Sequence, residues 1–216
     1  MSNPLELMLR EQFGTPEQQR ETSTAGMWIF LATEVLFFGG LFTTFAVYRS
    51  LYTHAFNEGS SEMGLMLGAI NTAVLITSSL TMALSVHSAS EGRNVRTYIL
   101  LLATAFLGLC FLGIKFTEYY HHYQAHRVPG ISFLSNSPEA GPLELFFVFY
   151  FMMTGLHALH MIIGIGVVSV FAARAALGSF NADYFTPVET VGLYWHFVDI
   201  VWVFLFAIFY IAGIHK

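Results

Sequence analysis

Five long apolar stretches follow one another along this chain and constrain its fold more than any other feature. About 20 apolar residues, wound into a helix, cross the roughly 30 Å hydrocarbon layer of a bilayer. Clusters of Gly, Ser, Asn, Pro and charged residues separate the stretches and mark loops. The sequence predicts an all-α fold, an integral membrane bundle of five transmembrane helices within residues 25–216, at about 25–48, 64–87, 97–118, 144–173 and 190–213.

The composition agrees with a protein surrounded by lipid. Hydrophobic residues make up 55% of the 216 residues and charged residues only 11%, with a mean hydropathy of +0.60. Such a chain has too few charges to coat a water-soluble globule. The net charge of -5 and the lack of a basic stripe exclude nucleic acid as a partner. The single cysteine, Cys110, allows no disulfide within the chain.

The residues between the apolar stretches predict how the chain is oriented. Residues 1–24 form a polar N-terminal tail, which we interpret as something other than a cleavable signal peptide. Positive residues concentrate on the cytoplasmic side of membrane proteins. We therefore expect a multi-pass protein of the cell inner membrane with a cytoplasmic N terminus and a periplasmic C terminus, since Arg10, Arg20, Arg93, Arg96 and Arg174 outnumber Arg49, Arg127 and Lys216.

Glu34 is the only charged residue between Ala25 and Tyr48 and lies near the middle of the first predicted span. Burying an ionisable group there costs on the order of 3 kcal/mol on insertion scales, so a partner is expected. His160 in the fourth span lies at a similar depth, and a carboxylate–imidazole pair relieves the cost of burying either group alone. The pair either has a functional role or only fixes the packing of two helices.

Two further pairs of polar residues are spaced three apart, which places each pair on one helix face. His157 and His160 form the first pair, for which metal ligation and polar packing are both open interpretations. His196 and Asp199 form the second, in the fifth span, which opens with Glu189. They predict either a proton relay or a rigid polar contact at the membrane edge.

Four motifs in order along the chain resemble subunit III of the haem-copper oxidases. The last motif is the most specific, and together the four cover nearly the whole chain. They are Met27–Phe38 (MWIFLATEVLFF), Lys115–Tyr119 (KFTEY), Thr154–His160 (TGLHALH) and Tyr194–Trp202 (YWHFVDIVW).

The resemblance implies an accessory subunit of a proton-pumping terminal oxidase that reduces oxygen to water. Such a subunit carries no redox centre, and the haem and copper belong to partner subunits. It packs mainly against subunit I, with subunit II also in the complex, and the resemblance allows membership of a respiratory supercomplex. The family's helices splay around a cleft that holds phospholipids, proposed as an oxygen route, and the subunit supports proton uptake and turnover lifetime.

Site residues transfer one by one from the resemblance. Glu34 matches the family's buried carboxylate and His160 its imidazole partner, while Arg174 matches an arginine that holds a lipid phosphate. An arginine at a helix end also suits this role without the family, because a guanidinium reaches the interface and binds phosphate through two hydrogen bonds. With His157, Glu189, His196 and Asp199, these residues form the predicted lipid-binding or buried polar network.

One departure from the family and two alternative functions remain open. Many members have seven helices, and this chain lacks the first two, which form one wall of the lipid cleft. Either another subunit supplies that wall, as in five-helix bacterial forms, or the lipid site differs here. The alternatives are a related accessory protein of nitric oxide reductase and a membrane cytochrome that binds haem through His157, His160 and His196.

Overall fold

The computed structural model describes residues 14–130, 133–135, 137–181 and 184–213. Five of its helices are long and apolar enough to cross a membrane, which confirms the predicted all-α bundle of five spans. A short helix and a π-helical turn complete the described part of the chain. The elements are α1 (Pro16–Leu51), α2 (Thr53–Ser61), α3 (Leu65–Ser90), α4 (Asn94–Gln124), α5 (Ala140–Ala176), α6 (Thr186–Phe206) and η2 (Ala207–Ile211).

Most helices extend beyond the apolar stretches that predicted them. α1 begins at Pro16, where Thr15 caps the helix by accepting a hydrogen bond from the Gln18 amide at 3.1 Å. Proline is well suited to this first position, since its missing N–H would have no partner there. Residues 16–24 of the predicted polar tail are therefore helical. Residues 1–13, with Arg10, and Lys216 at the other end lie outside the described residues.

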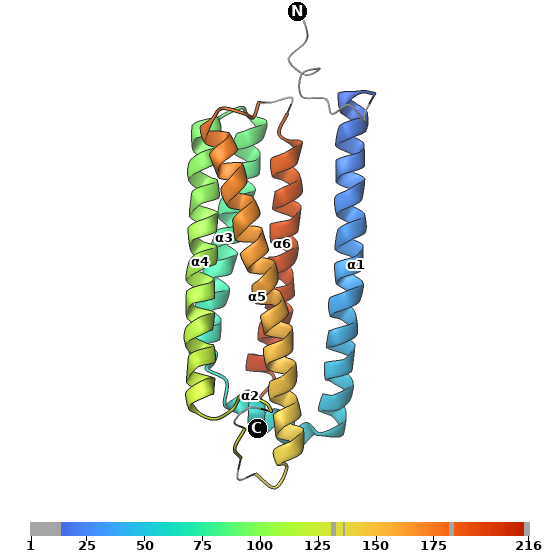
Figure 1. Ribbon diagram of the computed structural model, residues 1–216, viewed down its shortest axis with the longest axis vertical. Helices are drawn as coiled ribbons and strands as arrows, with labels where there is room; N and C mark the ends of the chain where they lie inside the picture. The colour runs from blue at the N-terminus through green and yellow to red at the C-terminus, as the bar shows by residue number, and fades with distance from the viewer. Residues whose placement is uncertain (1–13, 131–132, 136, 182–183, 214–216) are drawn as a thin grey trace, which may run out of the picture.

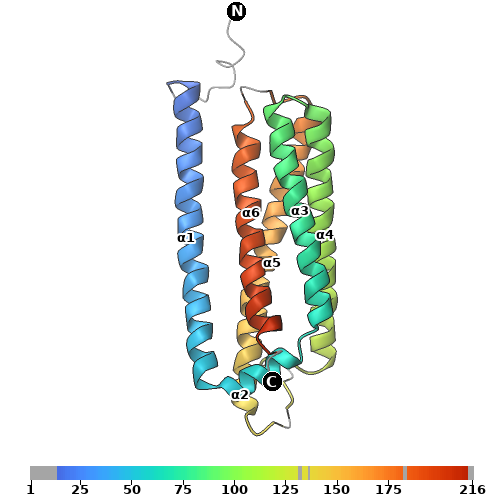
Figure 2. The same ribbon diagram turned by 180° about the vertical axis from the view of Figure 1, so that it is seen from behind.

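Four of the long helices form a bundle, and α1 stands apart from them over much of its length (Figures 1 and 2). α6 is the most enclosed of the five long helices. Half of the residues in its most apolar 18-residue segment are buried, whereas only 17% are buried in the corresponding segment of α1. The exposed face of α1 is apolar and includes Trp28, Ile29 and Leu36. In a membrane protein such a face meets lipid or another chain.

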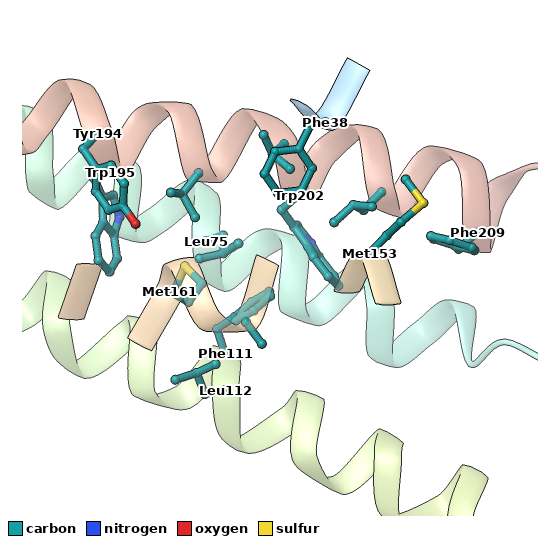
Figure 3. Close-up of a cluster of buried hydrophobic side chains, with 14 of the residues drawn as sticks. Phe38, Leu75, Phe111, Leu112, Met153, Met161, Tyr194, Trp195, Trp202 and Phe209 are labelled. Carbon is teal, nitrogen blue, oxygen red and sulfur yellow. The ribbon is translucent and has the colours of Figure 1, made fainter. Parts of the chain in front are cut away.

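The centre of the bundle is filled by aromatic and aliphatic side chains from facing helices (Figure 3). Trp202 projects from α6 onto Phe111 of α4, with the ring centroids 4.7 Å apart in an edge-to-face arrangement. A Cβ atom on Gly108 would lie only 2.9 Å from the Trp195 ring. Small residues at such points allow helices in lipid to approach closely.

α2 fastens the lower end of α1 to the bundle. Its Phe56 contacts Phe45 of α1 and Phe146 of α5, at centroid distances of 5.3 and 5.6 Å. At the same end, the Arg49 guanidinium donates a 2.8 Å hydrogen bond to the Ala212 carbonyl after η2. α1 is therefore anchored by aromatic packing and by a cation at a helix C terminus, where positive charge is favourable.

Candidate functional site

Glu34 and His160 meet across the interface between α1 and α5. The distance from the Glu34 Oε2 atom to the His160 Nε2 atom is 3.3 Å, and both side chains are mostly buried. The contact is close enough for an ion pair but lacks the alignment of a hydrogen bond, since Oε2 has no hydrogen-bond partner among the described residues. A small adjustment, or protonation of one partner, would make it a direct hydrogen bond.

Neighbouring groups hold the His160 ring in place. Its Nδ1 atom lies 2.8 Å from the Leu156 carbonyl oxygen one turn earlier, so Nδ1 carries the proton and leaves Nε2 facing Glu34. Tyr194 of α6 donates to the His160 carbonyl at 2.9 Å, and Phe38 of α1 packs edge-on against the ring. Residues of α1 and α6 therefore both contact His160 of α5.

His157 has a different environment from His160, although the two are three residues apart. Its ring is sandwiched between Phe111 and Trp202, at centroid distances of 5.4 and 5.2 Å, and is 1% exposed. Neither ring nitrogen has a hydrogen-bond partner among the described residues. The ring is therefore held by packing against aromatic side chains.

His196 and Asp199 share Ser79 of α3 as a neighbour. The Ser79 hydroxyl and the His196 Nδ1 atom are 2.7 Å apart and hydrogen-bonded. Asp199 also lies beside Ser79. However, neither of its carboxyl oxygens makes a well-aligned hydrogen bond within the described residues, although the side chain is buried. The two residues face a groove between α3 and α6.

The last two predicted site residues lie at the end of the bundle where α5 ends and α6 begins. The Arg174 guanidinium covers two stacked phenyl rings, those of Phe171 and Phe180, at 5.7 and 5.5 Å. Glu189 lies in the first turn of α6, where a negative charge is stabilised by the helix dipole. The predicted network thus divides into the Glu34–His160 pair, the enclosed His157, the groove and this interfacial end.

The most extensive buried polar cluster was missed as a site from the sequence. Lys115 of α4 is 1% exposed, and its ammonium donates hydrogen bonds to Glu118 at 2.9 Å, Tyr150 at 2.9 Å and Tyr210 at 2.8 Å. Tyr210 in turn donates to the second Glu118 oxygen at 2.5 Å. All three ammonium protons therefore have acceptors, which is the condition for burying a lysine.

Aromatic rings enclose this ammonium on several sides. The Lys115 Nζ atom lies 4.6 Å from the Tyr150 ring centroid and 5.1 Å from that of Trp202. Cation–π attraction of this kind strengthens when water is excluded. The signal that could have revealed the cluster was a lysine and a glutamate three apart at the end of an apolar stretch. We call Lys115, Glu118, Tyr150 and Tyr210 the lysine cluster.

Metal binding was one interpretation of the paired histidines. In the described part of the chain, no three His, Cys, Asp or Glu side chains come together as a group that could hold a metal ion. His157 contacts aromatic rings and His160 contacts Glu34.

Comparison with known proteins identifies the family. The family model described as cytochrome c oxidase subunit III matches residues 15–214. The chain belongs to the cytochrome c oxidase subunit III family. Cytochrome c oxidase subunit 3 of Synechocystis is 31% identical over 188 residues, which cover 86% of this chain and 74% of that protein.

Two other relatives show how widely the family extends. Cytochrome c oxidase subunit 3 of Alkalihalophilus pseudofirmus is 31% identical over 189 residues, 88% of this chain and 86% of the relative. Cytochrome bo(3) ubiquinol oxidase subunit 3 of Pseudomonas aeruginosa is 30% identical over 189 residues, 87% and 84% of the two chains. The chain is thus subunit III of a haem-copper cytochrome c or quinol oxidase, which confirms the resemblance seen in the four motifs.

Membership of the family defines the chain's general role. It is a multi-pass membrane subunit of a respiratory terminal oxidase complex, so partner subunits exist. The family carries no redox centre of its own. These findings favour the oxidase over the two alternatives, an accessory protein of nitric oxide reductase and a haem-binding cytochrome.

Proposed function

We propose that this subunit supports oxygen reduction from a distance, by holding helices and phospholipids beside subunit I. It thereby maintains oxygen access, proton uptake and the number of turnovers that the complex completes. Subunit I is the main partner and subunit II the second. The observation that carries the proposal is the Glu34–His160 contact, which joins an outlying helix to the bundle at mid-membrane depth.

This contact is well placed to define the space beside α1. α1 is fastened at one end by α2 and Arg49, and at mid-depth Glu34 reaches the bundle through His160. The rest of α1 exposes apolar side chains. Phospholipid chains against this face would provide a hydrocarbon medium, in which oxygen is more soluble than in water. Removing the contact would allow α1 to move and the lipids to exchange.

Arg174 supports the lipid part of the proposal. It lies in the last turn of α5, with its guanidinium above Phe171 and Phe180. This packing fixes the aliphatic part of the side chain and leaves a planar donor group at the membrane interface, which suits a lipid phosphate. We assign this end of the bundle to the cytoplasmic side, because Arg20, Arg93 and Arg96 also lie there.

The experiment removes the subunit from the purified oxidase with detergent and measures the remaining core. We expect the visible haem spectrum and the initial rate at saturating oxygen to change little. The oxygen concentration that gives half the maximal rate should rise, since the lipid route has been removed. A control core kept in the same detergent without dissociation accounts for detergent effects. Immediate loss of the haem spectrum would contradict an accessory role, and an unchanged oxygen dependence would contradict the oxygen route.

A further inference from the structure

A groove of about 450 Å³ lies between α3 and α6, two helices that stand side by side in Figure 2. Its lining residues recur every three or four positions on each helix, so the groove follows the helix axes. On α3 the residues along its length are Thr72, Ile76, Ser79 and Ala83, and on α6 they are His196, Asp199, Ile200 and Val203. The rim is apolar and exposed, with Ile76 and Ile200 each more than half accessible.

The floor of this groove carries an unpartnered carboxyl group. Asp199 is 7% exposed, and neither of its oxygens has a hydrogen-bond partner among the described residues. It lies near the middle of the span Thr186–Ile211, where the surroundings are hydrocarbon. The Ser79 hydroxyl lies beside Asp199 but is hydrogen-bonded to the His196 Nδ1 atom and makes no well-aligned hydrogen bond to the carboxyl group. Burying a carboxyl group without a hydrogen-bond donor costs free energy, so we expect Asp199 to find a donor outside this chain.

The shape and lining of the groove distinguish between two kinds of occupant. An acyl chain would fill apolar space but supplies no donor to Asp199. A helix supplies both, because its side chains fit between the ridges of two neighbouring helices and one of them can carry a hydroxyl, amide or amine. Thr72, Ser79 and Ala83 are small, and small residues along a helix allow another helix to approach in lipid.

We propose that this groove is the docking site for a transmembrane helix of another oxidase subunit, which donates a hydrogen bond to Asp199 from a side chain at mid-membrane depth. Membership of a membrane complex guarantees that such helices exist. The proposal deepens the proposed association with partner subunits by naming the contact face and its chemistry. It does not depend on the lipid or oxygen roles.

Photo-crosslinking in the intact complex tests the occupant. A photoreactive amino acid replaces Ile76 or Ile200 at the rim, and the membranes are irradiated before the oxidase is purified. We expect crosslinked peptides that join the groove to one membrane-spanning segment of a partner subunit. Crosslinks to phospholipid alone, or no crosslink from either position, would overturn the proposal in favour of a lipid-filled groove.

Substitutions at Asp199 test the hydrogen bond. Asp199→Leu removes the acceptor and should lower the crosslinking yield from Ile76 on the order of tenfold, the equivalent of one hydrogen bond to a buried polar group. Asp199→Asn keeps an acceptor oxygen and should retain most of the yield. The thermal unfolding of the isolated subunit should be unchanged or raised in Asp199→Leu, since an unpartnered polar group has been replaced by an apolar one of similar size. An unchanged crosslinking yield in Asp199→Leu would overturn the assigned hydrogen bond.

A steric variant keeps the test decisive if Asp199→Leu does not fold. Ala83→Phe fills the groove, and Ala73→Phe places the same ring at an exposed position on α3 that does not line it. Ala83→Phe should reduce the crosslinking yield severalfold or more, and Ala73→Phe should leave it near the parent value. Equal yields in the two variants would contradict docking in the groove. Crosslinking is independent of turnover and oxygen measurements, so failure of this inference is distinguishable from failure of the proposed function.

Discussion

Lys115 and Tyr210, ninety-five residues apart in the chain, are joined by a 2.8 Å hydrogen bond from the ammonium to the phenol oxygen. The bond ties α4 to η2, the last turn of the described chain. Glu118 accepts from both residues and closes a ring of buried hydrogen bonds. Tyr210 of η2 is therefore part of the buried polar cluster.

The lysine cluster should be sensitive to removal of one charge. Lys115→Met leaves the Glu118 carboxylate buried without its cation, and we expect a loss of about 3–5 kcal/mol in unfolding free energy. The double variant Lys115→Met/Glu118→Leu should lose less than the sum of the two single variants, because no charge is left unpaired. Chemical unfolding of the purified subunit in detergent measures all three. Additive losses would show that the two charges do not stabilise each other.

The Glu34–His160 pair should also show coupling. Replacing Glu34 by Leu, or His160 by Leu, leaves one polar group in the α1–α5 interface without its partner, whereas the double replacement leaves none. We expect a coupling energy of about 0.5–3 kcal/mol, the range found for residues in direct contact. A thermal-unfolding double-mutant cycle checks this, with His157→Leu in place of His160→Leu as the control pair. Coupling of the same size in the control cycle would mean that the effect is not specific to the contact.

Charges within apolar stretches predicted part of the site. That reasoning found Glu34 and His160, which the structure places 3.3 Å apart. The same signal applies to Lys115 and Glu118, but they stand at the end of the stretch predicted at 97–118, and the sequence offers only a resemblance to the family's helix end there. The structure continues α4 to Gln124, and this extension places both residues inside the bundle.

Other features depend on contacts that no local pattern records. His157 and His160 lie three residues apart and have similar neighbours in the sequence. His157 nevertheless packs between two aromatic rings, whereas His160 faces Glu34 of α1. Which neighbour each ring meets is decided by how the helices rotate and pack. α2 was also missed, because its nine residues contain no apolar stretch that distinguishes a short helix from a loop.

Stability should depend on pH through Glu62, which lies outside the membrane spans and pairs with Arg127 at 2.6 Å. Burial raises the pKa of the Glu62 carboxyl above its ordinary value of 4.5, and Arg127 opposes this only in part. A folded-state pKa above the unfolded one means that the folded state binds more protons in this window, so stability falls as pH rises from about 4.5 through the raised pKa. Glu62→Gln should flatten this part of a thermal-unfolding profile. The same slope in Glu62→Gln and in the control Glu91→Gln would rule out Glu62 as its source.

Arg174 should retain phospholipid in the purified complex. Arg174→Ala removes a cation worth about 1 kcal/mol toward an anionic headgroup, and more where the contact is bidentate. We expect fewer phospholipids per complex by mass spectrometry and faster inactivation during turnover. Arg96→Ala, at the same end of the bundle, is the matched control. Unchanged lipid content and inactivation rate in Arg174→Ala would place the lipid site elsewhere.

The most direct test of the account counts the turnovers that the oxidase completes before it inactivates. The count is made on the intact complex, on the core stripped of this subunit, and on the core after the purified subunit is added back. Our account predicts similar initial rates at saturating oxygen in all three, far fewer turnovers for the stripped core, and recovery after add-back. An equal number of turnovers with and without the subunit would contradict the central claim that it supports catalysis from a distance.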